Sequence, residues 1–216
     1  MTIIAIEGGI GALGIEIAVR LADQLGLALY DTGDFEKRLL TRLNEDRPLN
    51  ENSPLPAESC AWRNDLHLAL HVPTSRWCRM ISNEVLELAA YDNVVIEGWG
   101  AAALLSRYPH TRRVRVTATL EDRLRRLTGL YASASRAQLC QAIESSDAIN
   151  KFYLNWFGAG VDARTLFNLQ VDTSAASVDE CVETITSFNA SRRKAAQGYS
   201  SAIISALAKI APSGRA

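Results

Sequence analysis

Hydrophobic residues along the chain fall into two alternating kinds of segment. Five short apolar runs, rich in β-branched residues, are typical of strands buried on both faces of a parallel sheet. They are TIIAIE at 2–7, LALYD at 27–31, NVVIE at 93–97, RVRVT at 113–117 and FNLQVD at 167–172. Between them apolar residues recur at intervals of three and four, the period of an amphipathic helix, as in Ile15, Ala18, Val19, Ala22 and Leu25. This alternation predicts a five-stranded, doubly wound α/β sheet with helices on both faces.

Two segments interrupt the alternation. The stretch from Pro48 to Pro56 is too rich in proline to continue a helix, and we expect it to join two helices. Residues 129–165 are expected to form a helical lid, because ligands bind beyond the carboxyl ends of parallel strands. The sequence therefore predicts a single domain over residues 1–192, with its lid at about 129–165, and a C-terminal helix and tail at 193–216.

The first apolar run leads into a glycine-rich turn that fits two phosphate-binding motifs. Gly9, Gly11 and Gly14 match the dinucleotide motif G-x-G-x-x-G, whereas Gly9 and Gly14 alone match the mononucleotide motif G-x-x-x-x-G-K-[S/T]. In both motifs backbone N–H groups and a helix N-terminus face a phosphate. Ile15 and Glu16 replace the lysine and the hydroxyl residue of the second motif.

An NAD-binding Rossmann domain is one alternative interpretation of this turn. Asp31 ends the second run near the distance at which a carboxylate binds a ribose hydroxyl. However, five runs rather than six are present, and no tyrosine is followed four residues later by the lysine of short-chain dehydrogenases. The rest of the chain favours the mononucleotide motif.

Four segments, taken in order, resemble the cytidylate-kinase-like family of P-loop kinases. These segments are LADQLGLALYDTGDFEKRLL, NVVIEGWGAAALL, RVRVTATLEDRLRRL and LFNLQVDTSAASVDECVETI. The loop of that family often has the sequence G-S-G-G-R-E, and residues 11–16 (GALGIE) stand in its register. The resemblance covers roughly residues 2–190 and implies a three-layer P-loop kinase fold.

The resemblance also implies roles for particular residues. The loop residues that would cradle the donor phosphates of ATP are Gly9, Gly11, Ala12, Gly14, Ile15 and Glu16. Glu97 is placed like a carboxylate that holds Mg²⁺ through water, and Asp31 or Asp34 would orient the acceptor hydroxyl. Arg123 and Arg126 would close the lid over phosphates.

Three positions at which the family carries a cation are altered. Ile15 replaces the basic residue of the loop, Trp99 replaces the arginine of a G-R-G turn, and Asn150 ends the lid motif D-x-x-R, with Lys151 one residue late. Each charge-assisted hydrogen bond to a phosphate contributes roughly 1.5–3 kcal/mol. The sequence therefore predicts a weakened ATP-phosphate site, in which Trp99 binds a base or sugar by stacking and Lys151 assists the lid.

The amino-acid composition limits the classes of partner that we expect for the protein. The net charge of −1, from 23 basic and 24 acidic residues, gives no indication of a nucleic-acid or membrane partner. The four cysteines are too widely spaced to indicate a zinc site or a disulfide framework, and the N-terminus lacks the pattern of an export signal. We therefore expect a cytoplasmic protein with a small-molecule partner, and a homo-oligomer is left open.

Two functional hypotheses follow. The retained carboxylates favour a kinase-like phosphotransferase that uses ATP and Mg²⁺ on a nucleoside monophosphate or another small acceptor. The absence of a cation at Ile15 favours a pseudokinase, which would keep the fold as a nucleotide-binding or regulatory module without catalysis.

Overall fold

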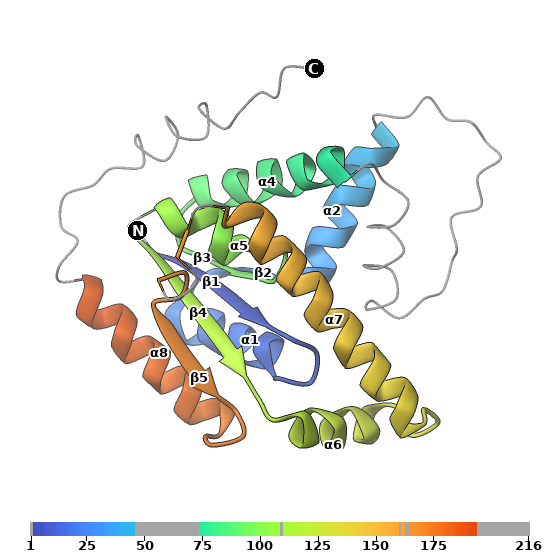
Figure 1. Cartoon of the computed structure of the whole chain (residues 1–216). Helices are drawn as coiled ribbons and strands as arrows, with labels where there is room; N and C mark the ends of the chain where they lie inside the picture. Colours follow the sequence, from blue (N-terminus) through green and yellow to red (C-terminus); the bar gives the residue numbers. More distant parts are fainter. Residues whose placement is uncertain (1, 46–73, 109, 160, 163–164, 194–216) are drawn as a thin grey trace.

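Five parallel strands form a single sheet in the computed structural model, which describes residues 2–45, 74–108, 110–159, 161–162 and 165–193. The sheet has the order β2-β3-β1-β4-β5 (Figure 1). Its strands are β1 (Ile3–Gly8), β2 (Ala28–Tyr30), β3 (Val94–Glu97), β4 (Thr111–Thr117) and β5 (Leu169–Asp172). Each strand overlaps one of the five apolar runs, so the predicted sheet is confirmed.

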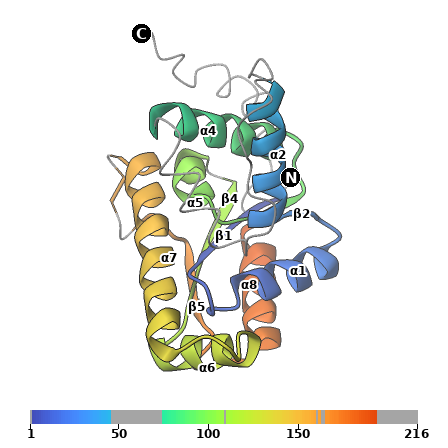
Figure 2. The ribbon, with the colours of Figure 1, turned by 90° about the vertical axis from the view of Figure 1, so that its right-hand side faces the viewer.

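Helices cover both faces of this sheet and complete a three-layer architecture. They are α1 (Gly14–Leu25), α2 (Thr32–Glu45), α4 (Thr74–Ala90), α5 (Ala101–Leu104) with the 3₁₀ turn η1 (Leu105–Arg107), α6 (Leu120–Leu130), α7 (Arg136–Phe157) and α8 (Val178–Arg193). Figure 2 shows α1 and α8 on one side of the strands and α5 and α7 on the other. The predicted three-layer α/β fold is confirmed.

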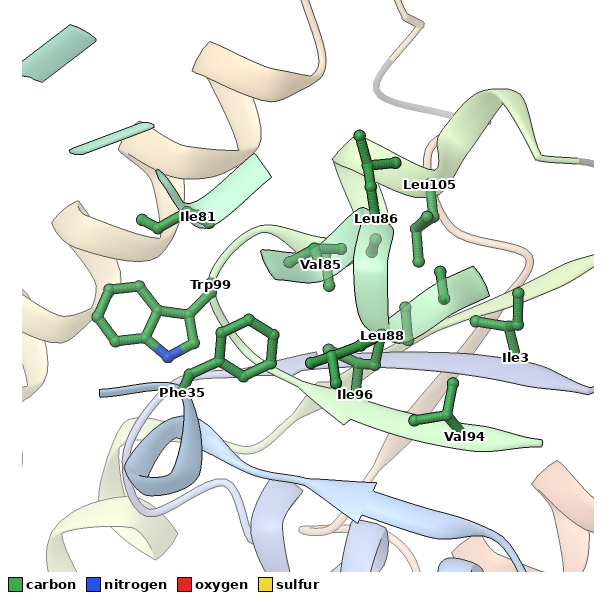
Figure 3. Close-up of a cluster of buried hydrophobic side chains, with 14 of the residues drawn as sticks. Ile3, Phe35, Ile81, Val85, Leu86, Leu88, Val94, Ile96, Trp99 and Leu105 are labelled. Atoms are coloured by element: carbon green, nitrogen blue, oxygen red, sulfur yellow. The ribbon is translucent and has the colours of Figure 1, made fainter. Parts of the chain in front are cut away.

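Alternate side chains of the central strand enter two separate hydrophobic cores. Ile3 and Ala5 of β1 pack with residues of α2, α4 and α5, whereas Ile4 and Ile6 pack with residues of α1 and α8. Figure 3 shows part of the first core, in which the Phe35 ring lies between the Trp99 indole and the β3 residue Ile96. Because both faces are covered, the central strand consists almost entirely of apolar residues, unlike a half-exposed strand.

The segment predicted to be a lid contains the end of α6 and the whole of the 22-residue helix α7. A capping box starts α7, since Ser135 Oγ accepts from the Gln138 N–H and Gln138 Oε1 accepts from the Ser135 N–H. The two helices share a small core of Leu124, Leu127, Leu139 and Ile143. Closure of this segment over a ligand stays a prediction.

Two predicted segments lie outside the described residues. They are the proline-rich stretch at 48–56 and the C-terminal tail, of which residues 194–216 are not described. Among the described helices, none combines the length and the apolar character that crossing a membrane requires.

Candidate functional site: a glycine loop beside buried carboxylates

The glycine loop joins β1 to α1 through two residues in the left-handed region of backbone space. Gly11 has a φ of 76° and Leu13, which precedes the first residue of α1, has a φ of 65°. Leu13 occupies the third position of the G-S-G-G-R-E register, where the family has a glycine. A left-handed conformation costs a side-chain-bearing residue about 1–2 kcal/mol, so the loop is held by its surroundings.

Side chains from α6, α7 and the segment after β5 hold this loop through its backbone carbonyls. The hydrogen bonds run from Asn150 Nδ2 to Gly8 O (3.0 Å), from Arg123 Nε to Ile10 O (2.7 Å), from Arg126 Nη1 to Gly11 O (2.8 Å) and from Thr173 Oγ1 to Ala12 O (3.0 Å). The loop is therefore fixed from outside while the N–H groups at the start of α1 lack intrahelical partners.

We call the four side chains that hold the loop, those of Asn150, Arg123, Arg126 and Thr173, the clamp. Arg123 makes further contacts within it. Its Nη1 and Nη2 donate to the two carboxylate oxygens of Asp147 at 2.8 and 2.7 Å. The ion pair lies against the loop so closely that a Cβ on Gly9 would overlap both groups. Gly9 is thus needed for packing against the clamp, whatever the ligand of the loop is.

Arg126 also holds the loop. Its Nη1 contacts Thr173 Oγ1 at 3.0 Å as well as Gly11 O, and its Nη2 donates to Thr173 O at 2.7 Å. In this arrangement the two arginines predicted to bind phosphates donate to backbone carbonyls, a hydroxyl and a carboxylate. Sequence reasoning missed these contacts because their partners are more than 20 residues away along the chain.

A pocket of about 470 Å³ opens between the loop, the start of α2, the turn after β3 and the helices α6 and α7. Nine of the residues predicted for the site line it: Gly9, Gly11, Gly14, Ile15, Glu16, Asp31, Glu97, Trp99 and Arg126. Ala12, Asp34, Arg123 and Lys151 are not among its lining residues. Lys151 lies on the exposed face of α7.

Glu97, the last residue of β3, is the most enclosed carboxylate of the pocket. Its side chain Oε2 accepts from the Thr32 hydroxyl at 2.7 Å, and its Oε1 would lie 3.4 Å from a Cβ on Gly14. Burial raises the pKa of Glu97 to about 7 despite the Thr32 hydrogen bond, and the carboxylate of Asp31 adds to this increase. Glu97 therefore changes its charge near neutral pH.

A second buried carboxylate, which sequence reasoning missed, belongs to Glu7 on β1. It is 3% exposed and accepts from the Ala102 N–H at 3.2 Å, and its Oε2 has no hydrogen-bond partner among the described residues. Burial raises the pKa of Glu7 to about 8, and the nearby Glu97 contributes. The sequence feature that could have identified Glu7 as a buried carboxylate is the presence of a charged residue within the apolar run at 2–7.

Trp99 lies in a backbone turn in which three consecutive residues have positive φ. Gly98, Trp99 and Gly100 have φ values of 84°, 58° and 70°. The indole is 4% exposed, its Nε1 donates to Thr32 O at 3.3 Å, and its ring centroid is 5.6 Å from that of Tyr153. Trp99 forms one wall of the pocket and also belongs to the core shown in Figure 3. Its stacking on a ligand stays a prediction.

The two candidate acceptor-site aspartates differ in position. Asp31 caps α2, since its Oδ1 accepts from the Asp34 N–H at 2.9 Å, and it lines the pocket. Asp34 lies inside the first turn of α2, which begins at Thr32. The carboxylate of Asp34 instead lies 3.7 Å from Lys37 Nζ.

The electrostatic character of the pocket is the reverse of that of a typical phosphate site. Among the described lining residues, Glu16, Asp31 and Glu97 are acidic and Arg126 is the basic one. Ile15, which is 44% exposed at the first turn of α1, offers no hydrogen-bond donor from its side chain. A phosphate in this pocket would therefore meet more acidic than basic side chains among the described residues, and the start of α1 would offer it backbone N–H groups.

The residues present fit a magnesium ion shared with a substrate. No group of three or more histidine, cysteine, aspartate or glutamate side chains in the described part of the chain is arranged to hold a metal. Mg²⁺ typically binds one or two carboxylates and completes its coordination with water and substrate phosphates. Glu97, beside the glycine loop, matches that requirement.

The sheet order, the glycine turn after β1 and the carboxylate that ends β3 define a protein of the P-loop kinase class. Shikimate kinase from Acinetobacter baumannii has a similar fold, with a TM-score of 0.55 and 13% identity over 89% of this chain and 94% of that one. A protein from Eubacterium ventriosum, described as uncharacterized, has a TM-score of 0.64 and 18% identity over 88% of this chain and 98% of that one.

Sequence comparison assigns the chain to a particular family within this class. Residues 3–175 match the cytidylate kinase-like family. Cytidylate kinase from Aeropyrum pernix is 30% identical over 175 residues, which are 81% of this chain and 91% of that protein. The chain therefore belongs to the cytidylate kinase-like family, and the predicted resemblance is confirmed. Family and fold support a nucleotide kinase-like phosphotransferase and lend no support to an NAD-binding domain.

Proposed function

We propose that the protein is a Mg²⁺-dependent phosphotransferase with a weakened ATP-phosphate site that acts on a small acceptor. The observation that carries this proposal is the meeting of the glycine loop, the start of α1 and the carboxylate of Glu97 in one pocket. The relative from Aeropyrum pernix, named a cytidylate kinase, supports ATP as the donor.

The donor phosphates would bind to the backbone at the start of α1. Residues 13–16 present N–H groups there, and the helix dipole adds a partial positive charge of about 0.5. Because Ile15 adds no charge, the site forgoes roughly 1.5–3 kcal/mol of binding free energy relative to a loop with arginine. ATP would therefore bind weakly without a metal.

Magnesium would be held through Glu97, and when bound it would supply positive charge to the donor phosphates. Residues of this chain would accept the hydroxyl proton and exclude water. Asp31, fixed at the start of α2 by its cap, would accept the proton of the acceptor hydroxyl. As the hydroxyl oxygen bonds to the γ-phosphorus, the bond from that phosphorus to ADP breaks. The walls formed by Trp99 and Tyr153 would exclude water from the reacting groups.

Phosphoryl transfer is tested by measuring ADP formation with Mg²⁺ and a panel of nucleoside monophosphates, nucleosides and hydroxy acids. We expect slow, acceptor-dependent turnover that is lost in Glu97→Gln. Failure of every acceptor to raise ADP formation above its rate without acceptor would contradict a phosphotransferase.

A pseudokinase is the second candidate, and the clamp favours it. Arg123 and Arg126 are already bound to Asp147, Thr173 and the loop carbonyls, and so would have to break these contacts to reach a phosphate. ATP that raises the melting temperature, with no turnover of any acceptor, would support this candidate over the first.

A further inference from the structure

The pocket has an exposed apolar wall at the end of α6. Leu130, the last residue of that helix, is 73% exposed, and Tyr131, which follows it, is 37% exposed, yet both line the same space as the glycine loop. Leu127, one turn earlier, completes this wall. Apolar side chains that stay in water on the wall of a pocket gain free energy when a ligand covers them. The end of α6 is therefore a contact surface available to the ligand of the loop.

The order of the strands decides which part of a ligand reaches this wall. β3, which ends at Glu97, and β2, which is followed by Asp31, lie on one side of β1, whereas β4, which leads into α6, lies on the other (Figure 1). In phosphoryl transfer the attacking and leaving oxygens are roughly in line, on opposite sides of the phosphorus. With the acceptor hydroxyl at Asp31, the leaving ADP therefore extends toward α6.

The spacing of residues along α6 fits this direction. Arg126 Nη1 donates to Gly11 O at 2.8 Å, which fixes this part of the helix beside the loop. Tyr131 follows five residues later, which corresponds to about 7.5 Å along a helix axis. This offset allows a sugar to lie between phosphates on the loop and the ring of Tyr131. The base of the nucleotide then meets Tyr131 and Leu130.

The wall offers few groups that distinguish one base from another. Leu127 and Leu130 carry no hydrogen-bonding group in their side chains, and Arg126 already donates to Gly11 O and to Thr173. Discrimination between bases depends on donors and acceptors that face the edges of the base. Stacking on an aromatic ring, in contrast, is open to every base, because each base has a π-face. These contacts therefore predict binding of a base without strong selection among bases.

We propose that Tyr131 and Leu130 form the site for the base of the nucleoside triphosphate donor, and that this site accepts different bases with similar affinity. The ring of Tyr131 stacks on the base, and Leu130 adds apolar contact. The placement of the donor rests on the proposed function. The stacking contact belongs to binding alone and requires no phosphoryl transfer.

Calorimetric titrations of the full chain with ATP, GTP and tripolyphosphate, each in the presence of Mg²⁺, test the proposal. ATP and GTP carry purine rings of the same size with different groups at their edges, and tripolyphosphate has no base. We expect ATP and GTP to bind with affinities within about threefold of each other. Both should bind about tenfold more tightly than tripolyphosphate.

Substitution of Tyr131 separates the ring from the hydroxyl. Tyr131→Ala should weaken the binding of ATP and GTP about tenfold and leave tripolyphosphate unaffected, because it removes the stacking surface. Tyr131→Phe keeps the ring and should retain the affinity of the wild type. Tyr91→Ala is the control, since Tyr91 is an exposed residue that follows α4 and is not among the lining residues of the pocket. It should leave all three affinities unchanged.

A difference of about tenfold or more between ATP and GTP, equal binding of ATP and tripolyphosphate, or an unchanged ATP affinity in Tyr131→Ala would overturn the proposal. ADP formation from ATP is measured separately. Nucleotide binding that depends on Tyr131, without turnover, would leave the proposal standing and count against the phosphotransferase. Turnover with the same KM for ATP in the wild type and in Tyr131→Ala would do the opposite.

Discussion

Ile15 determines how much charge the glycine loop offers to a phosphate. Its side chain is 44% exposed on the first turn of α1, beside the pocket, so a longer basic side chain can be placed there without disturbing the core. In Ile15→Arg we expect Mg²⁺-ATP to bind about 10- to 100-fold more tightly, from one charge-assisted interaction, with little change in stability. Calorimetric titration measures the change.

Val19→Arg is the matched control for this prediction. Val19 lies one turn further along the same helix and is similarly exposed, at 47%. It should gain little affinity, because charge effects at a helix N-terminus decline after the first turn. Equal affinities in the two variants would show that position 15 does not face the donor phosphates.

The clamp on the glycine loop belongs to the scale of whole elements, because it joins α6 and α7 to β1. Arg123→Ala would leave Asp147 without its partner and Ile10 O without its donor. We expect the free energy of unfolding to fall by about 1–3 kcal/mol, a range reduced because the Asp147 side chain is 49% exposed. Denaturant unfolding measures the loss.

Arg123→Lys should not restore this stability, since an ammonium group cannot reproduce the bidentate pair and the third bond to the loop. Arg136→Ala is the control, because its ion pair with Glu121 is exposed and should contribute little. Similar losses in Arg123→Ala and Arg136→Ala would contradict a structural clamp.

The strands and α1 could be predicted from sequence because their apolar periods are local properties of the chain. The spacing of the glycines located the loop, and the end of the apolar run that forms β3 located Glu97. The loop and Glu97 both line the pocket. The partners of Arg123 could not be predicted in this way, since its contacts with Ile10 and Asp147 are formed only by folding. Local sequence also gave no indication that Trp99 is largely buried.

At the scale of the whole molecule, the two buried carboxylates couple stability to pH. Burial raises the pKa of Glu7 to about 8 and that of Glu97 to about 7, from the ordinary value of 4.5. The folded state therefore retains protons that the unfolded state releases between pH 4.5 and these values. Their contribution to stability is complete below pH 4.5 and is lost as the pH rises through about 7 and then about 8.

Glu7→Gln tests this coupling without altering the shape of the side chain. We expect the variant to lose less stability than the wild type as the pH is raised from about 5 to about 8, because its amide does not ionise. Thermal unfolding over this range measures both slopes. Parallel slopes in the two proteins would mean that Glu7 is not protonated in the folded state.

The central claim is that backbone N–H groups and a metal held through Glu97 provide the ATP site in place of basic side chains. Calorimetric titration of the full chain with ATP tests it directly and requires no knowledge of the acceptor. We predict weak binding with Mg²⁺ that disappears when the metal is chelated and in Glu97→Gln. ATP binding that is equally strong without Mg²⁺, or no binding of Mg²⁺-ATP at all, would contradict the claim.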